Sequence, residues 1–186
     1  LSEGRHLLVE AGTGTGKSMA YLIPSFEWAA RNGQRVLVST NTINLQDQLI
    51  HKDIPDLNLA LQRDYRAAVL KGRRNYLCPR RLAAASRHGP RTAEEARVLA
   101  KLMVWLYGGG TGDVTEINLR GPVEAAIWGR MSSDYEECGL EACLAYAGGT
   151  CPYYKAHLAA ESAHVVIVNH ALLLAVYLHG AAADHR

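Results

Sequence analysis

The chain has 186 residues, enough for one domain or for one domain with a modest insertion. Hydrophobic residues make up 48% of it and charged residues 20%, which excludes a disordered chain. The formal net charge is only +2, so overall charge does not argue for a nucleic-acid-binding protein, and any such argument must rest on where the charges lie.

Neither a leader nor a membrane segment is visible in the sequence. The N-terminus lacks a basic region followed by an apolar stretch, and no apolar run reaches the roughly 18 residues of a membrane span. We therefore expect a soluble, intracellular protein, in a compartment where thiols stay reduced. In that compartment the four cysteines are metal ligands or free thiols before they are disulfides.

The first predicted elements alternate between strand and helix. A short apolar run at residues 7–9 predicts a strand, which leads through a glycine-rich loop into a helix predicted over residues 17–31. A buried strand is predicted at residues 35–40, and residues 43–52 return to the apolar spacing of a helix.

Two later runs complete the predicted sheet. A short strand is possible at residues 67–70, and the fully apolar, β-branched run at residues 165–168 suits the middle of a parallel sheet. Alternation of strands and helices implies right-handed crossovers and a sheet that is covered on both faces. The expected fold class is therefore α/β, with a mostly parallel sheet and helices on both faces.

The middle of the chain differs from its two ends. It holds all four cysteines, several basic clusters, a glycine-rich loop at residues 108–112, and helices predicted at residues 93–107 and 122–131. We interpret it as a mainly helical, cysteine-bearing insertion. The predicted organisation is residues 1–70 for the first part of the α/β lobe, 71–163 for the insertion and 164–186 for the return to the lobe.

The loop after the first predicted strand is typical of a phosphate-binding loop, since it ends in Gly-Lys-Ser and opens a helix. Its glycines let successive backbone N–H groups turn toward phosphate oxygens, and the helix adds its positive end. Lys17 should reach the β- and γ-phosphates of ATP, and Ser18 should offer its hydroxyl to Mg²⁺. The residues expected to contact ATP are Ala11, Gly12, Thr13, Gly14, Thr15, Gly16, Lys17 and Ser18. The alternative is a glycine-rich turn that binds nothing.

The four cysteines are unevenly spaced, with 59, four and seven residues between Cys78, Cys138, Cys143 and Cys151. Structural zinc sites usually show a tight pair of ligands, and only Cys138 and Cys143 form one. Wider spacing suits a [4Fe–4S] cluster, whose core is larger. The spacing leaves open an iron–sulfur cluster, a zinc site and buried thiols that only fill a core. His157, His164 and His170 could in principle replace a cysteine ligand.

These residues resemble one family, the iron–sulfur helicases of the DinG/XPD group within helicase superfamily two. Residues 10–18 resemble its motif I, residues 37–49 its motif Ia, and residues 71–78 the segment that presents the first cluster cysteine. Further segments are similar to the bacterial DinG branch in particular, namely residues 111–116, 151–154 and 166–174. The similarity runs over nearly the whole chain in matching order.

The resemblance implies a RecA-like motor lobe in which Lys17 and Ser18 are catalytic, and a [4Fe–4S] cluster held by all four cysteines. It also implies ATP-driven unwinding of DNA, with 5′ to 3′ translocation on a single strand. The expected partners are single-stranded DNA and forked or displaced-strand DNA, not a membrane. The expected location is the bacterial cytoplasm.

The sequence departs from this family in one important respect, because it contains no Asp-Glu-Ala-His box. The family's second motor lobe and its upstream adenine-binding segment are also not found. We therefore expect a piece of a longer enzyme. The missing acidic pair would hold Mg²⁺ and orient the attacking water, so the isolated chain should bind ATP weakly and lack measurable helicase activity.

Positive charge and a flat side chain gather near the first cysteine, as nucleic-acid binding requires. The candidate DNA contacts in this segment are Arg73, Arg74, Tyr76 and Arg80. The alternative is an ordinary solvated face of arginines with the tyrosine packed beneath it. The resemblance also places Thr40 and Asn41 of motif Ia beside the DNA backbone, where a hydroxyl and an amide suit phosphate contacts. These two residues could instead cap the helix that begins near Ile43.

Two other functions stay open from the sequence. One is a non-motor module that binds ATP and DNA and contains a structural zinc or iron–sulfur site. The other is a phosphate-loop ATPase with a zinc-binding insertion and no role on DNA.

Overall fold

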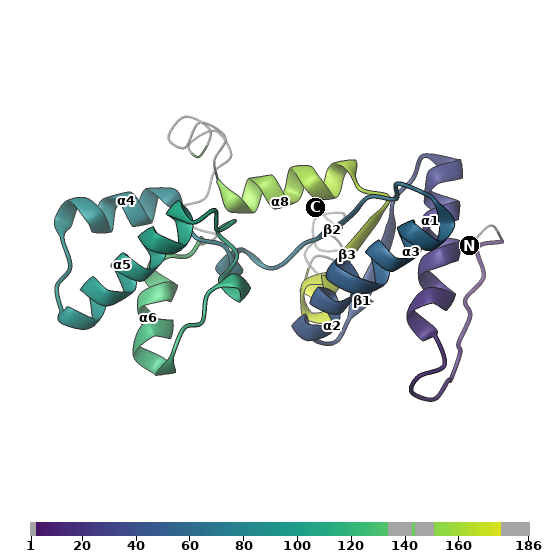
Figure 1. The fold of residues 1–186 in the computed structure, drawn as a ribbon, viewed down its shortest axis with the longest axis horizontal. Coiled ribbons are helices and arrows are strands. Elements are labelled where there is room, and N and C mark those ends of the chain that lie inside the picture. The colour runs from purple at the N-terminus through teal and green to yellow at the C-terminus, as the bar shows by residue number, and fades with distance from the viewer. Residues whose placement is uncertain (1–2, 134–142, 144–150, 176–186) are drawn as a thin grey trace, which may run out of the picture. The chain divides into compact units, whose positions relative to one another are not determined.

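The computed structural model describes residues 3–133, 143 and 151–175 of the 186-residue chain (Figure 1). The chain forms two compact units: unit 1 comprises Leu1–Leu70 and Ala159–Arg186, and unit 2 comprises Lys71–Leu158. The predicted roles of these stretches, an ATP-binding lobe and a cluster-bearing insertion, stay predictions. Within the described ranges, every helix is too short or too polar to cross a lipid bilayer.

Unit 1 is built on an open three-stranded sheet. Its strands are all parallel and lie in the order β1-β3-β2. Its helices and strands include α1 (Lys17–Asn32), β1 (Val36–Thr40), α2 (Ile43–Gln48), η1 (Leu49–Asp53), α3 (Ile54–Leu61), β2 (Ala67–Val69), the end of α8 (Pro152–Ser162) and β3 (Val165–Asn169). Residues 170–175, directly after β3, are also helical. This arrangement confirms the predicted α/β class with a parallel sheet.

The central strand, β3, has a hydrogen-bonded neighbour on each side, and each of its faces packs in a hydrophobic core. Val165 and Ile167 pack on one face in a core that includes Phe26 of α1. Val166, which points the opposite way, packs in a second core that includes Ala160 of α8. The β-branched run at residues 165–168 is therefore the buried strand that the sequence predicts.

Residues 7–9, for which the sequence predicts a strand, do not form one. Leu7, Leu8 and Val9 are 86%, 99% and 70% exposed. A strand needs a hydrogen-bonding neighbour, and β3 is already paired on both sides, so only the outer edges of β1 and β2 remain. In the described chain these residues pair with neither edge. The prediction is wrong because an apolar run does not by itself supply a ladder partner.

The helix predicted over residues 43–52 is longer than expected and runs on to Leu61 in three segments. Between α2 and α3 lies a π-helical turn, in which the backbone N–H of Ile54 donates to the carbonyl of Leu49. Pro55 follows at the start of α3 and has no N–H to donate. The wider turn lets the helix continue past this proline.

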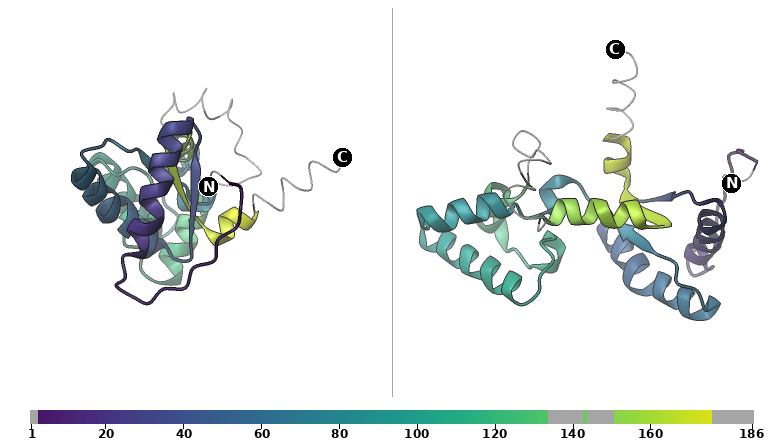
Figure 2. Two further views of the ribbon diagram at one scale, coloured as in Figure 1. Left: turned by 90° about the vertical axis from the view of Figure 1, so that its right-hand side faces the viewer. Right: turned by 90° about the horizontal axis from the view of Figure 1, so that it is seen from above.

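Unit 2 contains α4 (Pro79–His88), α5 (Ala93–Tyr107) and α6 (Gly121–Met131), which group together in the views of Figures 1 and 2. Helix α5 has the bounds predicted for it, because Thr92 caps its start by accepting a hydrogen bond from the N–H of Glu95. The three helices enclose a core made of Leu77, Val98, Leu99, Leu102, Ile127, Trp128 and Met131. Two single helical turns, η2 (Arg73–Asn75) and η3 (Val114–Glu116), and the first part of α8 also belong to this unit.

Candidate functional site

The glycine-rich loop before α1 is exposed, and two of its glycines adopt a backbone conformation that other residues disfavour. Gly14 and Gly16 have φ of +76° and +78°, in the left-handed region that side chains disfavour. Gly16 is the N-cap residue of α1, and no side chain of the described residues caps this helix start. The first N–H groups of α1 therefore point out of the helix end toward the loop, as an anion site requires.

The side chain of Lys17 folds back and hydrogen-bonds to the start of this loop. Its Nζ donates hydrogen bonds to the carbonyl oxygens of Ala11 and Gly12, at 2.9 and 3.0 Å. Thr15 Oγ1 donates to the same Gly12 oxygen at 2.9 Å. The ammonium group thus lies among the loop carbonyls and is exposed with the rest of the loop. Ser18, next along α1, is half-buried.

The carboxyl end of β1 places Thr40 and Asn41 differently from each other. Thr40 is buried, and its Oγ1 donates to the carbonyl oxygens of Thr42 and Val168, at 3.2 and 3.5 Å. Asn41 is exposed. Neither caps α2, because the cap is Thr42, whose hydroxyl accepts from the N–H of Leu45 at 3.2 Å. The hydroxyl of Thr40 is thus occupied within the sheet, while the Asn41 amide faces outward.

Two residues at this edge of the sheet were not singled out together from the sequence. Ser39 Oγ lies 2.7 Å from Nδ1 of His170, although the two residues are 131 positions apart. The pairing of β1 with β3 brings them together, since Thr40 is in register with Asn169. Each residue lies in a segment that resembles the helicase family, but no local signal in the sequence links them.

In unit 2 a buried ion pair joins two segments that carry the family resemblance. Lys71 Nζ donates to Asp113 Oδ2 at 2.7 Å and to Thr115 Oγ1 at 2.8 Å. The backbones also meet here, in a bridge between Tyr76 and Asp113 and in a hydrogen bond from the Leu77 N–H to the Gly112 carbonyl, at 2.9 Å. Residues 71–78 and 111–116 therefore form one structural element.

Tyr76 is buried, with 4% of its surface exposed, and its hydroxyl accepts the backbone N–H of Lys71 at 3.1 Å. Burial raises the pKa of this hydroxyl to about 12. Its ring packs edge-on against Tyr153, 5.8 Å away between centroids. The guanidinium of Arg73 lies over the other ring, 4.4 Å from the centroid of Tyr153. Tyr76 is thus packed beneath the arginine-bearing segment, and its ring is not exposed for stacking.

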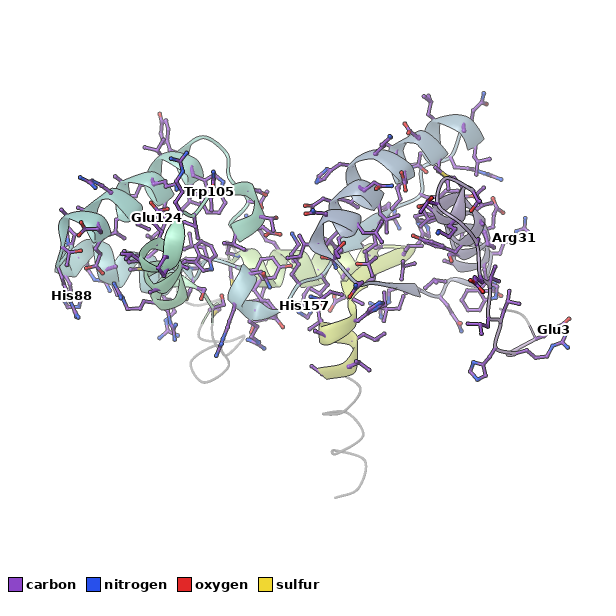
Figure 3. The ribbon with its side chains drawn as sticks, turned by 90° about the horizontal axis from the view of Figure 1, so that it is seen from below. Glu3, Arg31, His88, Trp105, Glu124 and His157 are labelled. Atoms are coloured by element: carbon purple, nitrogen blue, oxygen red, sulfur yellow. The ribbon has the colours of Figure 1, made fainter. Side chains whose placement is uncertain are left out.

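The tyrosine cluster extends along the first turns of α8. The rings of Tyr153 and His157 are 4.4 Å apart between centroids, and Tyr154 lies 5.4 Å from Tyr153 (Figure 3 labels His157).

An ion pair joins two other helices of unit 2: Lys101 Nζ of α5 donates to Glu124 Oε2 of α6 at 3.0 Å (Figure 3 labels Glu124).

The remaining basic candidates differ in exposure. Arg74 is exposed, and its backbone carbonyl accepts a hydrogen bond from the indole N–H of Trp128 at 2.9 Å. Arg80 is half-buried on α4, and Arg73 is half-buried against Tyr153. Among the predicted DNA contacts of this segment, Arg74 has the most accessible charge.

Three of the four cysteines lie in the described chain, and all three are buried and free of disulfides: Cys78, Cys143 and Cys151. Cys78 and Cys151 each precede a helix that begins with proline, and each carbonyl accepts the first hydrogen bond of its helix. Cys138 lies outside the described residues. Among the described residues, no group of three or more His, Cys, Asp and Glu side chains could hold a metal ion. The three described cysteines therefore do not form such a group by themselves, and the four-cysteine site, which includes Cys138, stays a prediction.

The first part of the chain matches a known protein family. Residues 1–72 match the DEAD/DEAH box helicase family. These residues include the glycine-rich loop, the sheet edge at Thr40 and Asn41, and the first residue of the buried ion pair, Lys71.

Several curated relatives are similar over most of the chain. It is 34% identical to the ATP-dependent DNA helicase DinG of Escherichia coli, over 93% of the chain and 26% of that relative. It is 39% identical to the ATP-dependent helicase DinG of Mycobacterium tuberculosis, over 91% of the chain and 28% of that relative. The corresponding helicase of Salmonella typhimurium is 35% identical over 93% of the chain. The chain is thus similar to DinG helicases over most of its own length, and it spans about a quarter of the length of these relatives.

Proposed function

We propose that this chain supplies the ATP-binding and DNA-binding parts of an ATP-dependent DNA helicase that moves 5′ to 3′ on single-stranded DNA in the bacterial cytoplasm. The similarity to DinG helicases over 91–93% of the chain supports this proposal. The observation that carries it is the conformation of the loop before α1, in which two left-handed glycines lead into a helix start next to the Lys17 ammonium.

The residues of this loop have complementary roles toward a bound nucleotide. The first N–H groups of α1 donate to phosphate oxygens, where the helix dipole also favours negative charge. Lys17 exchanges its hydrogen bonds with the Ala11 and Gly12 carbonyls for bonds with the β- and γ-phosphates. Ser18 holds Mg²⁺ through its hydroxyl. The other contacts come from the loop residues Gly12, Thr13, Gly14, Thr15 and Gly16.

Binding and turnover are expected to differ for this chain. The sequence contains no Asp-Glu-Ala-His box that would hold Mg²⁺ and orient the attacking water. We therefore propose that residues 1–186 bind ATP without hydrolysing it at an appreciable rate. Hydrolysis and unwinding belong to a longer helicase that contains the acidic pair.

We further propose that Cys78, Cys138, Cys143 and Cys151 hold a [4Fe–4S] cluster. Four cysteine thiolates are the donor set that such a cluster takes, and the three cysteines that the structure describes form no disulfide. Cys78 and Cys151 lie at helix starts, which are favourable places for negative charge, and Tyr76 packs against Cys151. When bound, the cluster would cross-link segments of unit 2 that are far apart in sequence.

The proposed DNA contacts lie on both units. Arg73, Arg74 and Arg80 provide positive charge in the segment around Cys78, and Tyr76 supports Arg73 through Tyr153. On unit 1, the proposed contacts are at the end of β1, where the amide of Asn41 is exposed and Thr40, which is buried, lies directly before it. Contacts of this kind hold the phosphate backbone and do not read the base sequence. Single-stranded and forked or displaced-strand DNA are the expected partners.

The experiment that tests the nucleotide site measures the affinity of this chain for a fluorescent ATP analogue with Mg²⁺. Lys17→Ala should weaken binding by at least about 10-fold, because the ammonium makes charge-assisted hydrogen bonds to phosphate. Lys52→Ala, which removes an exposed ammonium elsewhere on unit 1, should leave the affinity unchanged. Equal affinity of the parent chain and the Lys17 variant would contradict the proposed site.

A further inference from the structure

The carboxyl edge of the sheet brings together a pair of side chains that have no part in the proposed function so far. β1 and β3 are parallel neighbours, and both end at the same edge because Thr40 is in register with Asn169. Ser39 lies just before the end of β1, and His170 follows β3 directly. The carboxyl edge is where open parallel sheets bind their ligands.

The imidazole of His170 is held in place at this edge. Its Nδ1 is 2.7 Å from Ser39 Oγ. The backbone after β3 is fixed as well, since Asn169 Oδ1 accepts the N–H of Leu172 at 2.7 Å. His170 is nonetheless exposed, so the ring is oriented but is not buried in the core. The exposed amide of Asn41 lies two residues from Ser39 on the same edge.

The hydrogen bond with Ser39 occupies Nδ1, so a ligand on the outer side of the ring would meet Nε2. When the Ser39 hydroxyl donates to Nδ1, the proton of the neutral imidazole is on Nε2. When the ring is protonated, Nδ1–H donates to Ser39 Oγ and Nε2 carries a proton again. In both of these states Nε2 is a hydrogen-bond donor, which suits an acceptor. In the other neutral tautomer Nδ1–H donates to Ser39 Oγ and Nε2 is an acceptor, so an anionic ligand at Nε2 selects the first two states.

We propose that His170, oriented by Ser39, donates a hydrogen bond from Nε2 to a backbone phosphate of single-stranded DNA at this edge of the sheet. This inference rests on the proposed DNA-binding function and adds to it a contact residue, His170, and a positioning residue, Ser39. Asn41 offers a second donor beside it. Two such donors, without a lysine or arginine between them, are better suited to bind one phosphodiester group with its single charge than the clustered charges of a nucleoside triphosphate.

The test measures binding of this chain to a fluorescein-labelled thymidine oligonucleotide by anisotropy. His170→Ala should weaken the affinity by at least about 10-fold, the effect of one hydrogen bond to a charged group. Ser39→Ala should weaken it by a smaller factor, Ser39→Thr should restore it, and the Ser39→Ala, His170→Ala double variant should be no weaker than His170→Ala. His51→Gln removes another exposed histidine of unit 1 and serves as the matched control.

A second oligonucleotide separates phosphate from base contacts. With neutral methylphosphonate linkages, the difference between the parent chain and His170→Ala should disappear, and with adenine in place of thymine it should stay the same. A loss that depends on the base, or persists on the neutral backbone, would overturn the phosphate contact. His170→Gln, and the urea midpoint of each variant, show whether a loss comes from unfolding.

The experiment distinguishes failure of the proposed His170 contact from failure of the proposed DNA-binding function. If the parent chain binds the oligonucleotide and His170→Ala binds equally well, the inference about His170 is wrong and DNA binding stands. If the parent chain does not bind at all, the proposed DNA-binding function is wrong and the inference falls with it.

Discussion

Lys71 and Asp113 form an ion pair whose side chains are only 5% and 17% exposed, with Nζ and Oδ2 2.7 Å apart. The pair connects the entry of unit 2 to the segment after its glycine-rich loop. Thr115 accepts a further hydrogen bond from Nζ, so the ammonium donates to both Asp113 and Thr115 and is largely shielded from solvent. Removing one partner of such a pair leaves an uncompensated buried charge.

Asp113→Ala should therefore destabilise unit 2 by about 3 kcal/mol, measured by urea unfolding. Arg31→Ala breaks the ion pair with Glu27 on α1, in which the arginine side chain is 77% exposed, and should change the unfolding free energy by less than about 1 kcal/mol. Similar destabilisation by the two variants would show that the buried pair has no special structural role.

Gly112 should tolerate no side chain. Its φ is +94°, and an added Cβ would come within 2.3 Å of Pro152 Cγ. Gly109 has the same φ of +94° but meets nothing within 4 Å, so it is the matched control. Gly109→Ala should cost only the backbone strain of about 1 kcal/mol, whereas Gly112→Ala should cost more and displace the start of α8 next to Cys151. Equal unfolding free energies for the two variants would contradict this close contact.

The stability of unit 2 should depend on pH through Glu95. Hydrogen bonds from the Arg91 backbone N–H at 2.8 Å and from the Arg130 guanidinium at 3.0 Å hold the pKa of this carboxyl below its ordinary value of 4.5. The folded state therefore binds the proton less tightly than the unfolded state. The stabilisation is present above the ordinary pKa and is lost as the pH falls through the lowered one.

Urea midpoints of the parent chain and of Glu95→Gln, measured between neutral pH and about pH 3, check this prediction. The parent chain should lose more stability than the variant over that interval. A variant that loses as much stability on acidification as the parent would rule out the contribution of Glu95.

The basic segment should hold DNA mainly by charge. Arg74 is exposed, whereas Arg73 also packs over the ring of Tyr153. The Arg73→Ala, Arg74→Ala double variant should bind single-stranded DNA more weakly, and its affinity should depend less steeply on salt, by about one unit of slope for each DNA phosphate that is no longer neutralised. Arg74→Ala alone should show the flatter slope without a loss of folding stability. An unchanged salt slope in the double variant would exclude this segment from the DNA path.

Features with a local cause were predictable from the sequence. The bounds of α5 follow from the Thr92 cap, and β3 follows from a β-branched run that only a buried central strand accommodates. Features that depend on distant partners were not. Residues 7–9 have strand composition but no ladder partner in the described chain, and the contact between Ser39 and His170 arises only when β1 pairs with β3.

The same distinction applies to the candidate site. The phosphate loop could be recognised because its glycines and lysine are adjacent in sequence. The burial of Tyr76 could be given from the sequence only as an alternative, because it depends on packing against Tyr153, which comes from a distant segment. The wider turn before Pro55 is a local effect that residue spacing alone does not reveal.

The most direct test of the proposed helicase segment is the visible absorption spectrum of this chain after anaerobic purification, with its iron and sulfide contents measured on the same sample. We expect a brown protein with broad visible absorption and iron and sulfide in equal amounts, and we expect Cys138→Ser to abolish both the colour and the bound iron and sulfide. A colourless protein that contains zinc, or no metal, under these conditions would contradict the proposed cluster.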